Sequence, residues 1–376
     1  MQRKIISFIL FLLWASLLLA KGKEVRVVFC GDTNFAESYQ ENFARKGQRN
    51  VLVDLGYDYS IEEVGVLAKR ADLTIANLET VITSLRKSSY AGKKSYIHYS
   101  HVKKTPDALK RWGIDAVSLG NNHTMDFGLA GLKETVQVLK KCSIPCFGGG
   151  LTEKAACAPY FTKVTVGAQT FPLIVLGAFE YRARYQRKYS FYAKGPVGGV
   201  NGWTDESCVA QVKATRKKHP QAFIVAFPHW GSNYHWRNKE QKRRARAMIE
   251  GGANLIIGHG AHMLQEVEKY KGRYIVYSLG NFVFNTKGRY DKDKKPPYSL
   301  IAQLTFKAKG KGIGHSLRLY PTFCNNRKSY FRSRLATKGE MEPIKKLLLR
   351  LESKSSKLRR QLIIAEDELG PYIKCP

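Results

Sequence analysis

The sequence contains no Cys-x-x-Cys pair, although seven of its 376 residues are cysteine. Their spacing also differs from that of a zinc ribbon, which argues against a metal site built from thiolates. In an oxidising compartment, an odd number of cysteines leaves at least one thiol unpaired. Cys30 lies inside the apolar run 25–30, so we expect it to be a small core residue and not a reactive thiol.

Acidic residues are scarce: 30 Asp and Glu stand against 63 Lys and Arg, which gives a formal net charge of +33. A positive field of this size attracts an anionic polymer, anionic lipid headgroups or nucleic acid. The signatures of a helix-turn-helix, a zinc finger and an RNA-recognition module are absent, so we do not expect nucleic acid to be the main partner. The densest basic segments are 181–194, 237–247, 287–295 and 345–360.

The first twenty residues differ from the rest of the chain. Two cationic side chains precede sixteen residues without a charge, and Lys21 restores polarity. This pattern predicts an export signal. Sixteen residues span roughly 24 Å as a helix, less than a bilayer core of about 30 Å. We therefore expect residues 1–20 to be a cleaved signal peptide of an exported cell-envelope protein, with an N-terminal membrane anchor as the alternative.

Short apolar runs alternate with helical patterns from residue 25 to about 285. We predict strands at 25–30, 73–77, 116–120, 173–179, 223–227, 254–258 and 274–279. Most of these runs are continuously apolar, as expected for strands covered on both faces. Helices are predicted at 128–142 and 238–252, and the alternation indicates an α/β domain.

The pattern changes after Lys287. Two alternating runs, 298–306 and 315–323, predict antiparallel strands, and residues 340–366 predict an amphipathic helix. No internal repeat or extended low-complexity segment is present. We therefore expect one α/β domain over 25–330 and a basic helical extension over 340–376.

Polar residues follow six of the predicted strands, at 31–34, 77–79, 120–126, 229–231, 258–262 and 280–281. In open α/β sheets, chemistry concentrates beyond the carboxyl ends of the strands. Together these segments supply two carboxylates, amide oxygens and three or four imidazoles, a ligand set that suits zinc, manganese or iron. We predict a centre of one or two divalent metal ions, although each motif alone also fits a turn or a hydrogen-bonding group.

Six segments of the chain, in this order, resemble the capsule-synthesis CapA family of the calcineurin-like metallophosphoesterase superfamily: FCGDTNF, ANLET, SLGNNHTMDFG, PHWGSNY, IIGHGAHMLQEVE and IVYSLGNFVF. The resemblance covers about residues 25–285. It implies a four-layer α/β/β/α sandwich of two mixed sheets. It also implies a role in the synthesis or export of the anionic polymer poly-γ-glutamate at the cell surface, with envelope or membrane partners.

The resemblance also suggests roles for individual residues. Asp32 resembles the first-strand metal carboxylate and Glu79 the bridging acid. His123 resembles the general acid or transition-state donor, and Asp126 could hold its imidazole in one tautomer. The metal-ligand candidates are Asp32, Glu79, Asn122, His229, His259 and His262.

The chain departs from the superfamily pattern at three motifs, and in one of them Asn233 occupies a place where many relatives carry an acid. The first motif is Asp-x-His, but Asn34 stands two residues after Asp32. The late motif is Gly-His-x-His, but Gly260 stands two residues before His262, and His259 three before it. Either His259 reaches the metal from a shifted loop, or only His262 binds. A weaker or single-metal site is therefore an alternative.

Three functions remain open at this point. The first is a CapA-like metal-binding protein that acts in the synthesis or export of an anionic capsule polymer. The second is an exported metal-dependent phosphoesterase, nucleotidase or nuclease, because a two-metal site also serves phosphoryl transfer. The third is a non-catalytic envelope protein that binds polyanions through its cationic surface.

Overall fold

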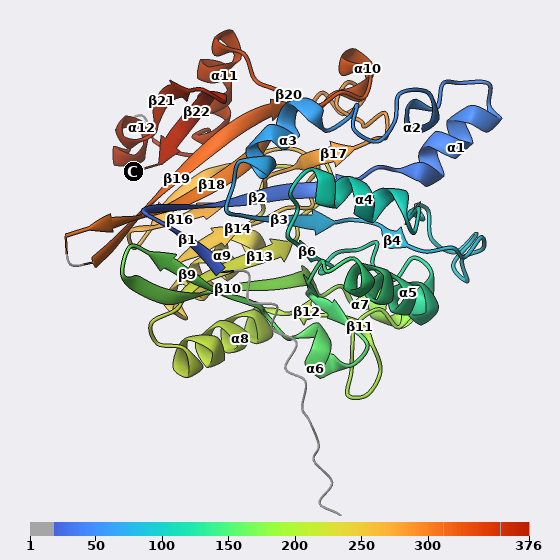
Figure 1. Cartoon of the computed structure of the whole chain (residues 1–376), viewed down its shortest axis with the longest axis horizontal. Coiled ribbons are helices and arrows are strands. Elements are labelled where there is room, and N and C mark those ends of the chain that lie inside the picture. Colours follow the sequence, from blue (N-terminus) through green and yellow to red (C-terminus); the bar gives the residue numbers. More distant parts are fainter. Residues whose placement is uncertain (1–18, 311, 354, 376) are drawn as a thin grey trace, which may run out of the picture.

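Two mixed β-sheets pack face to face in the computed structural model, which describes residues 19–310, 312–353 and 355–375 (Figure 1). Residues 1–18, most of the predicted export segment, lie outside the described residues. None of the helices in the described part of the chain has the length and apolar character needed to cross a bilayer.

The first sheet has eight strands, and seven of them follow the order β1-β9-β10-β13-β14-β16-β15, with β12 paired to β10. Its strands are β1 (Leu19–Gly22), β9 (Tyr160–Val166), β10 (Gln169–Glu180), β12 (Gly202–Trp203), β13 (Phe223–His229), β14 (Leu255–Ile257), β15 (Val267–Tyr270) and β16 (Arg273–Val276). The central pairs β10–β13, β13–β14 and β14–β16 are parallel, whereas β9 and β15 run antiparallel to their neighbours β10 and β16.

The second sheet has ten strands, and eight of them follow the order β21-β22-β19-β18-β2-β3-β6-β7. Its strands are β2 (Glu24–Asn34), β3 (Leu73–Leu78), β6 (Ala116–Ser118), β7 (Cys146–Phe147), β17 (Asn281–Phe284), β18 (Tyr298–Lys309), β19 (Gly312–Phe323), β20 (Arg334–Leu335), β21 (Ile363–Asp367) and β22 (Gly370–Cys375). Two small sheets pair β4 (Val81–Ile82) with β5 (Tyr99–Ser100) and β8 (Gly149–Gly150) with β11 (Gly199–Val200).

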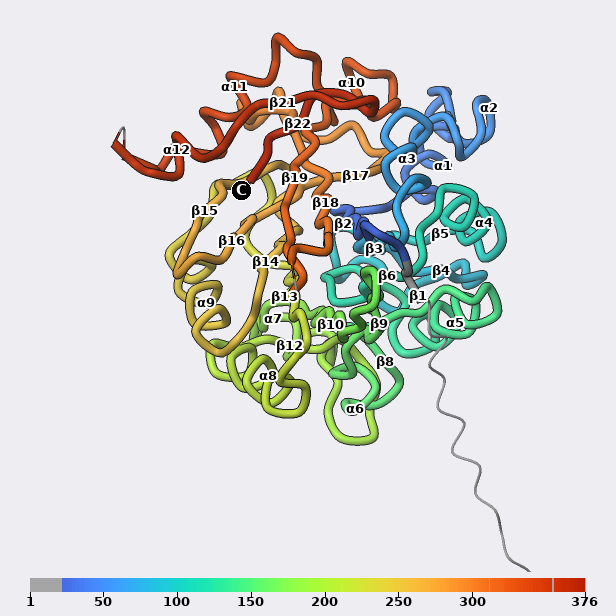
Figure 2. The backbone as a smooth tube through the Cα atoms, turned by 60° about the vertical axis from the view of Figure 1, so that its left-hand side comes forward, coloured from blue at the N-terminus to red at the C-terminus, as the bar shows by residue number. Residues whose placement is uncertain are grey.

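Helices cover the outer faces of both sheets (Figure 1, Figure 2). They are α1 (Glu37–Arg45), α2 (Val51–Asp54), α3 (Glu62–Lys69), α4 (Lys104–Arg111), α5 (Gly128–Lys141), α6 (Glu153–Ala156), α7 (Ala183–Tyr189), α8 (Asp205–Lys218), α9 (Lys239–Glu250), α10 (Asn326–Ser329), α11 (Lys338–Leu348) and α12 (Lys357–Gln361). The predicted four-layer α/β/β/α sandwich of two mixed sheets is confirmed, as are the seven predicted strands between residues 25 and 279, with shifted ends.

Successive residues of β2 face opposite sides of its sheet, and both sides are buried. Val27 and Phe29 point into the core between the sheets, where Phe29 meets Phe227 of β13 with ring centroids 5.8 Å apart. Val28 and Cys30 point to the outer core under α3, α4 and α5. The alternation explains the continuously apolar run, and it places Cys30 in the core as predicted.

Glycine allows the two sheets to touch near the ends of β6 and β10. A Cβ on Gly120, two residues beyond β6, would lie 2.6 Å from the backbone nitrogen of Ala178 in β10. A Cβ on Gly177 would lie 2.7 Å from the ring of Phe147 in β7. Any larger residue would push the sheets apart at this point.

The helix predicted over 340–366 is wrong in its second half. The helix α11 ends at Leu348, the short helix α12 follows, and β21 begins at Ile363. Strand β22 pairs with both β21 and β19, so this segment extends the ten-stranded sheet (Figure 2). The apolar β-branched residues at 363–364 and 373 find partners across a turn at 368–369, and this pairing, with the long-range pairing of β22 to β19, outweighs the local helical pattern.

The helix α11 begins with a capping box that also holds an ion pair. Glu340 accepts from Thr337 N–H (2.8 Å) and from both terminal nitrogens of Arg334 (2.8 and 3.0 Å). The Arg334 guanidinium lowers the pKa of Glu340 to about 2 from an ordinary 4.5. Because the pKa is lower in the folded state, the stabilisation is complete above pH 4.5 and is lost as the pH falls towards 2.

We expect Glu340→Gln to lower the free energy of unfolding by about 1 kcal/mol at pH 7. The difference between the variant and the unsubstituted protein should shrink as the pH falls below 4.5, because protonation of Glu340 removes the ion pair that the variant lacks at every pH. Chemical denaturation at a series of pH values measures this difference. Glu342→Gln, at an exposed position of the same helix, is the control. An equal and pH-independent effect of both substitutions would contradict the prediction.

Candidate metal centre

Asp32 lies near the end of β2, where the strand approaches the segment before β17. Its N–H donates to the carbonyl of Gly280 (2.8 Å). A Cβ on Gly31 would lie 1.9 Å from the same carbonyl oxygen, so only glycine permits the approach. The pairing of β2 with β3 shifts register between Cys30 and Asp32, an irregularity that can redirect a side chain. The Gly-Asp pair therefore combines a close backbone contact with a buried carboxylate.

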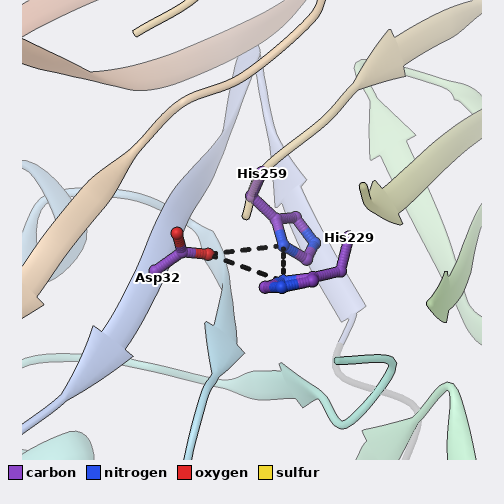
Figure 3. Close-up of side chains that lie close together, drawn as sticks. All are labelled: Asp32, His229 and His259. Carbon is purple, nitrogen blue, oxygen red and sulfur yellow. Dashed lines mark hydrogen bonds and ion pairs between the residues drawn. The ribbon is translucent and has the colours of Figure 1, made fainter. Parts of the chain in front are cut away.

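The first group of metal-ligand atoms comes from three strand ends (Figure 3). Asp32 Oδ1 lies 3.5 Å from His259 Nδ1 and 3.8 Å from His229 Nδ1. The two imidazole nitrogens are 3.1 Å apart. His229 ends β13, and His259 follows β14 at an isolated bridge to His229. All three side chains are buried.

A second group shares Asp32 with the first. Asp32 Oδ2 lies 3.2 Å from His262 Nδ1, and Glu79 Oε1 lies 3.8 Å from His262 Nε2. Glu79 directly follows β3, and its Oε1 also lies 3.9 Å from His229 Nε2. In each group the candidate ligand atoms lie within 4.8 Å of one another. Asp32 therefore belongs to both groups, whereas Glu79 belongs to the second group and lies near His229 of the first.

Several buried acceptors in this region have no hydrogen-bond partner among the described residues. They are both carboxylate oxygens of Glu79 and Oδ1 of Asn122. A buried acceptor without a partner costs free energy, which a bound cation would recover. The mixed oxygen and nitrogen donors suit zinc, manganese or iron. The residues present therefore fit a divalent metal centre.

Burial and neighbouring charges shift the pKa values of Asp32 and Glu79 in opposite directions. Burial raises the pKa of Glu79 well above its usual range, and the neighbouring charge of Asp32 raises it further. Burial also acts to raise the pKa of Asp32, but contacts with His259 and His262 hold it well below its usual range. A bound cation stabilises both carboxylates in the charged form.

His123 and Asp126 form a buried pair beside these groups. Asp126 Oδ2 lies 2.7 Å from His123 Nδ1, which leaves His123 Nε2 facing Glu79 Oε1 at 3.8 Å. With the Nδ1 proton donated to Asp126, Nε2 is the atom that can exchange a proton in the site. Burial, helped by the charge of Lys94, lowers the pKa of His123 well below its usual range. The predicted contact between His123 and Asp126 is present.

Two residues beside this pair were not predicted. Lys94 Nζ donates to Asp126 Oδ1 and to the backbone carbonyl of Asn122 (2.8 Å). The backbone N–H of His98 donates to Asp126 Oδ2 (2.7 Å), and the His98 ring lies 4.0 Å from that of His123. Both residues belong to the irregular segment between β4 and β5, where the sequence offers no strand end to mark them.

Three buried asparagines hold the strand ends in place. Asn34 donates to the carbonyl of Glu79 (3.1 Å) and accepts from Ala36 N–H, so it fixes backbone at the position where the resemblance suggested an imidazole ligand. Asn121 donates to Asn77 Oδ1 (3.0 Å), and Asn77 donates to Asp32 Oδ1 (3.0 Å). Asn121, the first amide of Gly-Asn-Asn-His, therefore has a structural role. Asn122, the second, has a side-chain oxygen without a hydrogen-bond partner among the described residues.

The loop after β14 brings both of its histidines to the site. Gly260, between them, has φ of 104°, and its N–H donates to Asp32 Oδ2 (3.2 Å). A Cβ on Gly260 would lie 2.9 Å from the ring of His229. Asn281 Oδ1 contacts His262 Nδ1 (2.9 Å) and orients this ring, a role that the sequence reasoning did not assign. The sequence left open whether His259 or only His262 could bind a metal. The structure places His259 with Asp32 and His229 in the first group, which favours binding by His259 as well.

A cleft of about 620 Å³ gives access to one side of the centre. Asn122, His123 and His262 line it, whereas Asp32 and Glu79 lie behind them. Its lining includes five cationic residues: Lys94, Arg182, Arg184, Lys287 and Arg289. No Asp or Glu is among the described residues that line the cleft. An anionic ligand would therefore approach the centre along a positively charged surface.

Comparison with known proteins reveals one family and several relatives. A family model described as bacterial capsule synthesis protein PGA_cap matches residues 26–286. The capsule biosynthesis protein CapA of Bacillus anthracis is 29% identical over 248 residues, which cover 65% of this chain and 58% of that protein. The PGA biosynthesis protein CapA of Bacillus subtilis (strain 168) is 29% identical over 258 residues, 68% of this chain and 63% of that protein. The match thus spans about three fifths of the length of these two relatives.

A third relative and one solved structure extend the comparison. A probable polyglutamine synthesis accessory protein of Mycobacterium tuberculosis (strain ATCC 25618 / H37Rv) is 28% identical over 293 residues, 74% of either chain. The calcineurin-like phosphoesterase YfkN from Bacillus subtilis has a TM-score of 0.46 and 12% identity, covering 78% of this chain and 90% of that one.

We expect Gly260→Ala to reduce the metal content of the purified protein, because the added methyl group would displace the His229 ring. The substitution also forces alanine into a left-handed backbone, at a cost of about 1–3 kcal/mol. Elemental analysis and thermal unfolding measure the two effects. Gly272→Ala is the matched control, since Gly272 also has positive φ (74°) but no atom near its Cβ position. Equal metal content in both variants would contradict the prediction.

Proposed function

We propose a function from the premise that the chain belongs to the bacterial capsule synthesis protein family PGA_cap. We infer that the protein acts in the synthesis or export of an anionic capsule polymer of the poly-γ-glutamate type, through a divalent metal centre. Relatives named for capsule, PGA and polyglutamine synthesis support this proposal. One observation carries it: two ligand groups that share Asp32 adjoin a cleft whose lining, among the described residues, has five cations and no carboxylate.

In this proposal, Asp32, His229 and His259 would hold one cation, and Asp32, Glu79 and His262 a second, with Asn122 as a further oxygen donor. The bound metal supplies positive charge that stabilises the negative charge developing on the reacting group. His123 Nε2 donates or accepts the proton, and Asp126 keeps the imidazole oriented. The buried position of the carboxylates excludes bulk water from their side of the centre.

We place this activity in the cell envelope, where the predicted export segment would deliver the protein. The formal net charge of +33 supports an encounter with polyanions there. The envelope or membrane partners expected from the sequence remain part of the proposal.

We expect His123→Asn to lower surface polymer in the native host by about a hundredfold or more, because it removes the proton donor. Its metal content should match that of the unsubstituted protein, since His123 belongs to neither ligand group. Asp32→Asn should lose both metal and polymer, because Asp32 belongs to both groups. Quantification of extracted polymer and elemental analysis of the purified protein measure the two outcomes.

His219→Asn is the control for these variants. His219 is the C-cap residue of α8, on the outer face of the eight-stranded sheet, and it belongs to neither ligand group. It should keep both metal and polymer. An unchanged amount of surface polymer in both His123→Asn and Asp32→Asn would contradict the catalytic role. The protein would then be a non-catalytic polyanion-binding protein.

A phosphoesterase is the second candidate, because a carboxylate shared between two metal positions also suits phosphoryl transfer. Under the favoured proposal, the manganese-loaded protein should show no metal-dependent turnover of a phosphomonoester, a phosphodiester or DNA. The measurement is the release of phosphate or the cleavage of DNA by the unsubstituted protein and by the Asp32→Asn variant. Turnover that Asp32→Asn abolishes would favour the phosphoesterase.

A further inference from the structure

The five cations of the cleft differ in whether a carboxylate compensates their charge. Three of them contact a carboxylate: Lys94 with Asp126, Arg182 with Glu180, and Arg289 with Asp293. In each of these pairs the opposite charges largely cancel at a distance, so the pair adds little to the attraction of an anionic ligand.

Lys287 and Arg184 retain their charge. Lys287 Nζ donates to the neutral amide oxygen of Gln48 (2.8 Å) and lies 4.9 Å from the centre of the Phe43 ring. Arg184 forms no hydrogen bond or ion pair with any residue in the described ranges 19–310, 312–353 and 355–375, and its side chain is exposed. These two residues are therefore the uncompensated charges of the cleft.

The two uncompensated cations belong to distant segments of the chain. Arg184 lies in α7, after the end of β10, and Lys287 follows β17. In Figure 1, α7 lies below β3, whereas β17 lies above it. Both residues line the same cleft as His123 and His262. Arg184, Lys287 and the metal centre thus offer three separate points that attract negative charge.

We propose that Arg184 and Lys287 form an anion subsite that recognises a chain with repeated carboxylates, beyond the unit that reacts at the metal centre. The inference rests on the proposed function and assigns its specificity to these two residues. A ligand with a single anionic group would occupy the centre alone and leave both cations unused. A polymer with a carboxylate on each unit can contact all three points.

The surroundings of Lys287 support this role. Gln48 and the face of Phe43 hold its ammonium group at the cleft, so little side-chain freedom remains to be lost when an anion binds. Arg184, in contrast, is free to adjust to the ligand. The subsite therefore combines one fixed and one adaptable cation.

The test compares two double variants with the same loss of charge. Arg184→Ala/Lys287→Ala removes the subsite, whereas Lys217→Ala/Lys218→Ala removes two exposed cations from the last turn of α8, outside the cleft. Both lower the net charge by two. Fluorescence anisotropy with labelled poly-γ-glutamate, using manganese-loaded protein, measures the affinity, and monomeric glutamate competes as the single-unit ligand.

We expect the subsite variant to bind poly-γ-glutamate about tenfold more weakly or worse, and with a weaker dependence on salt, since two charge-assisted contacts are lost. Its affinity for monomeric glutamate and its metal content should be unchanged. The α8 variant should bind polymer like the unsubstituted protein.

An equal loss of affinity for poly-γ-glutamate in both double variants, or no loss in either, would overturn the proposal of a subsite. Selective binding of polyphosphate in place of poly-γ-glutamate by the unsubstituted protein would overturn the assignment to a carboxylate chain. Because the subsite variant keeps the ligands of the metal centre, failure here is distinct from failure of the proposed function, which the Asp32 and His123 variants test.

Discussion

Two buried carboxylates, Asp32 and Glu79, lie close together in the interior of this protein, and their repulsion is the constraint that organises the site. Desolvation and like charge both oppose ionisation of the pair. The imidazoles of His229, His259 and His262 surround the pair, together with acceptors that have no hydrogen-bond partner among the described residues, and such a set of groups suits a cation. The arrangement is costly for an apolar core but suited to a centre that concentrates positive charge.

The precision of this arrangement comes from asparagines that are not themselves candidate metal ligands. Asn34, Asn77 and Asn121 join β2, β3 and the loop after β6 through side-chain hydrogen bonds. Such bonds fix side-chain positions more tightly than loop packing alone. The asparagine that replaces an expected imidazole has thus become part of the support, while His259 supplies an imidazole from another loop.

Much of the fold was predictable because apolar runs and strand-end polar residues are local signals. Asp32, Glu79, His123, His229 and His262 all follow or end predicted strands, and the structure brings them together. Lys94 and His98 could not be found, because their position depends on how a long irregular segment packs against the loop between β6 and α5. The strands β21 and β22 were missed for a related reason, since their stability comes from pairing with a strand that is distant in sequence.

The close contact of Gly120 with the backbone of Ala178 also bears on how this scaffold can diversify. The sheets cannot separate there without losing their packing, whereas the connections after β10 and β17 lie outside this contact. Those connections carry Arg184 and Lys287. Substitutions in these peripheral loops would therefore leave the spacing of the inner ligands unchanged.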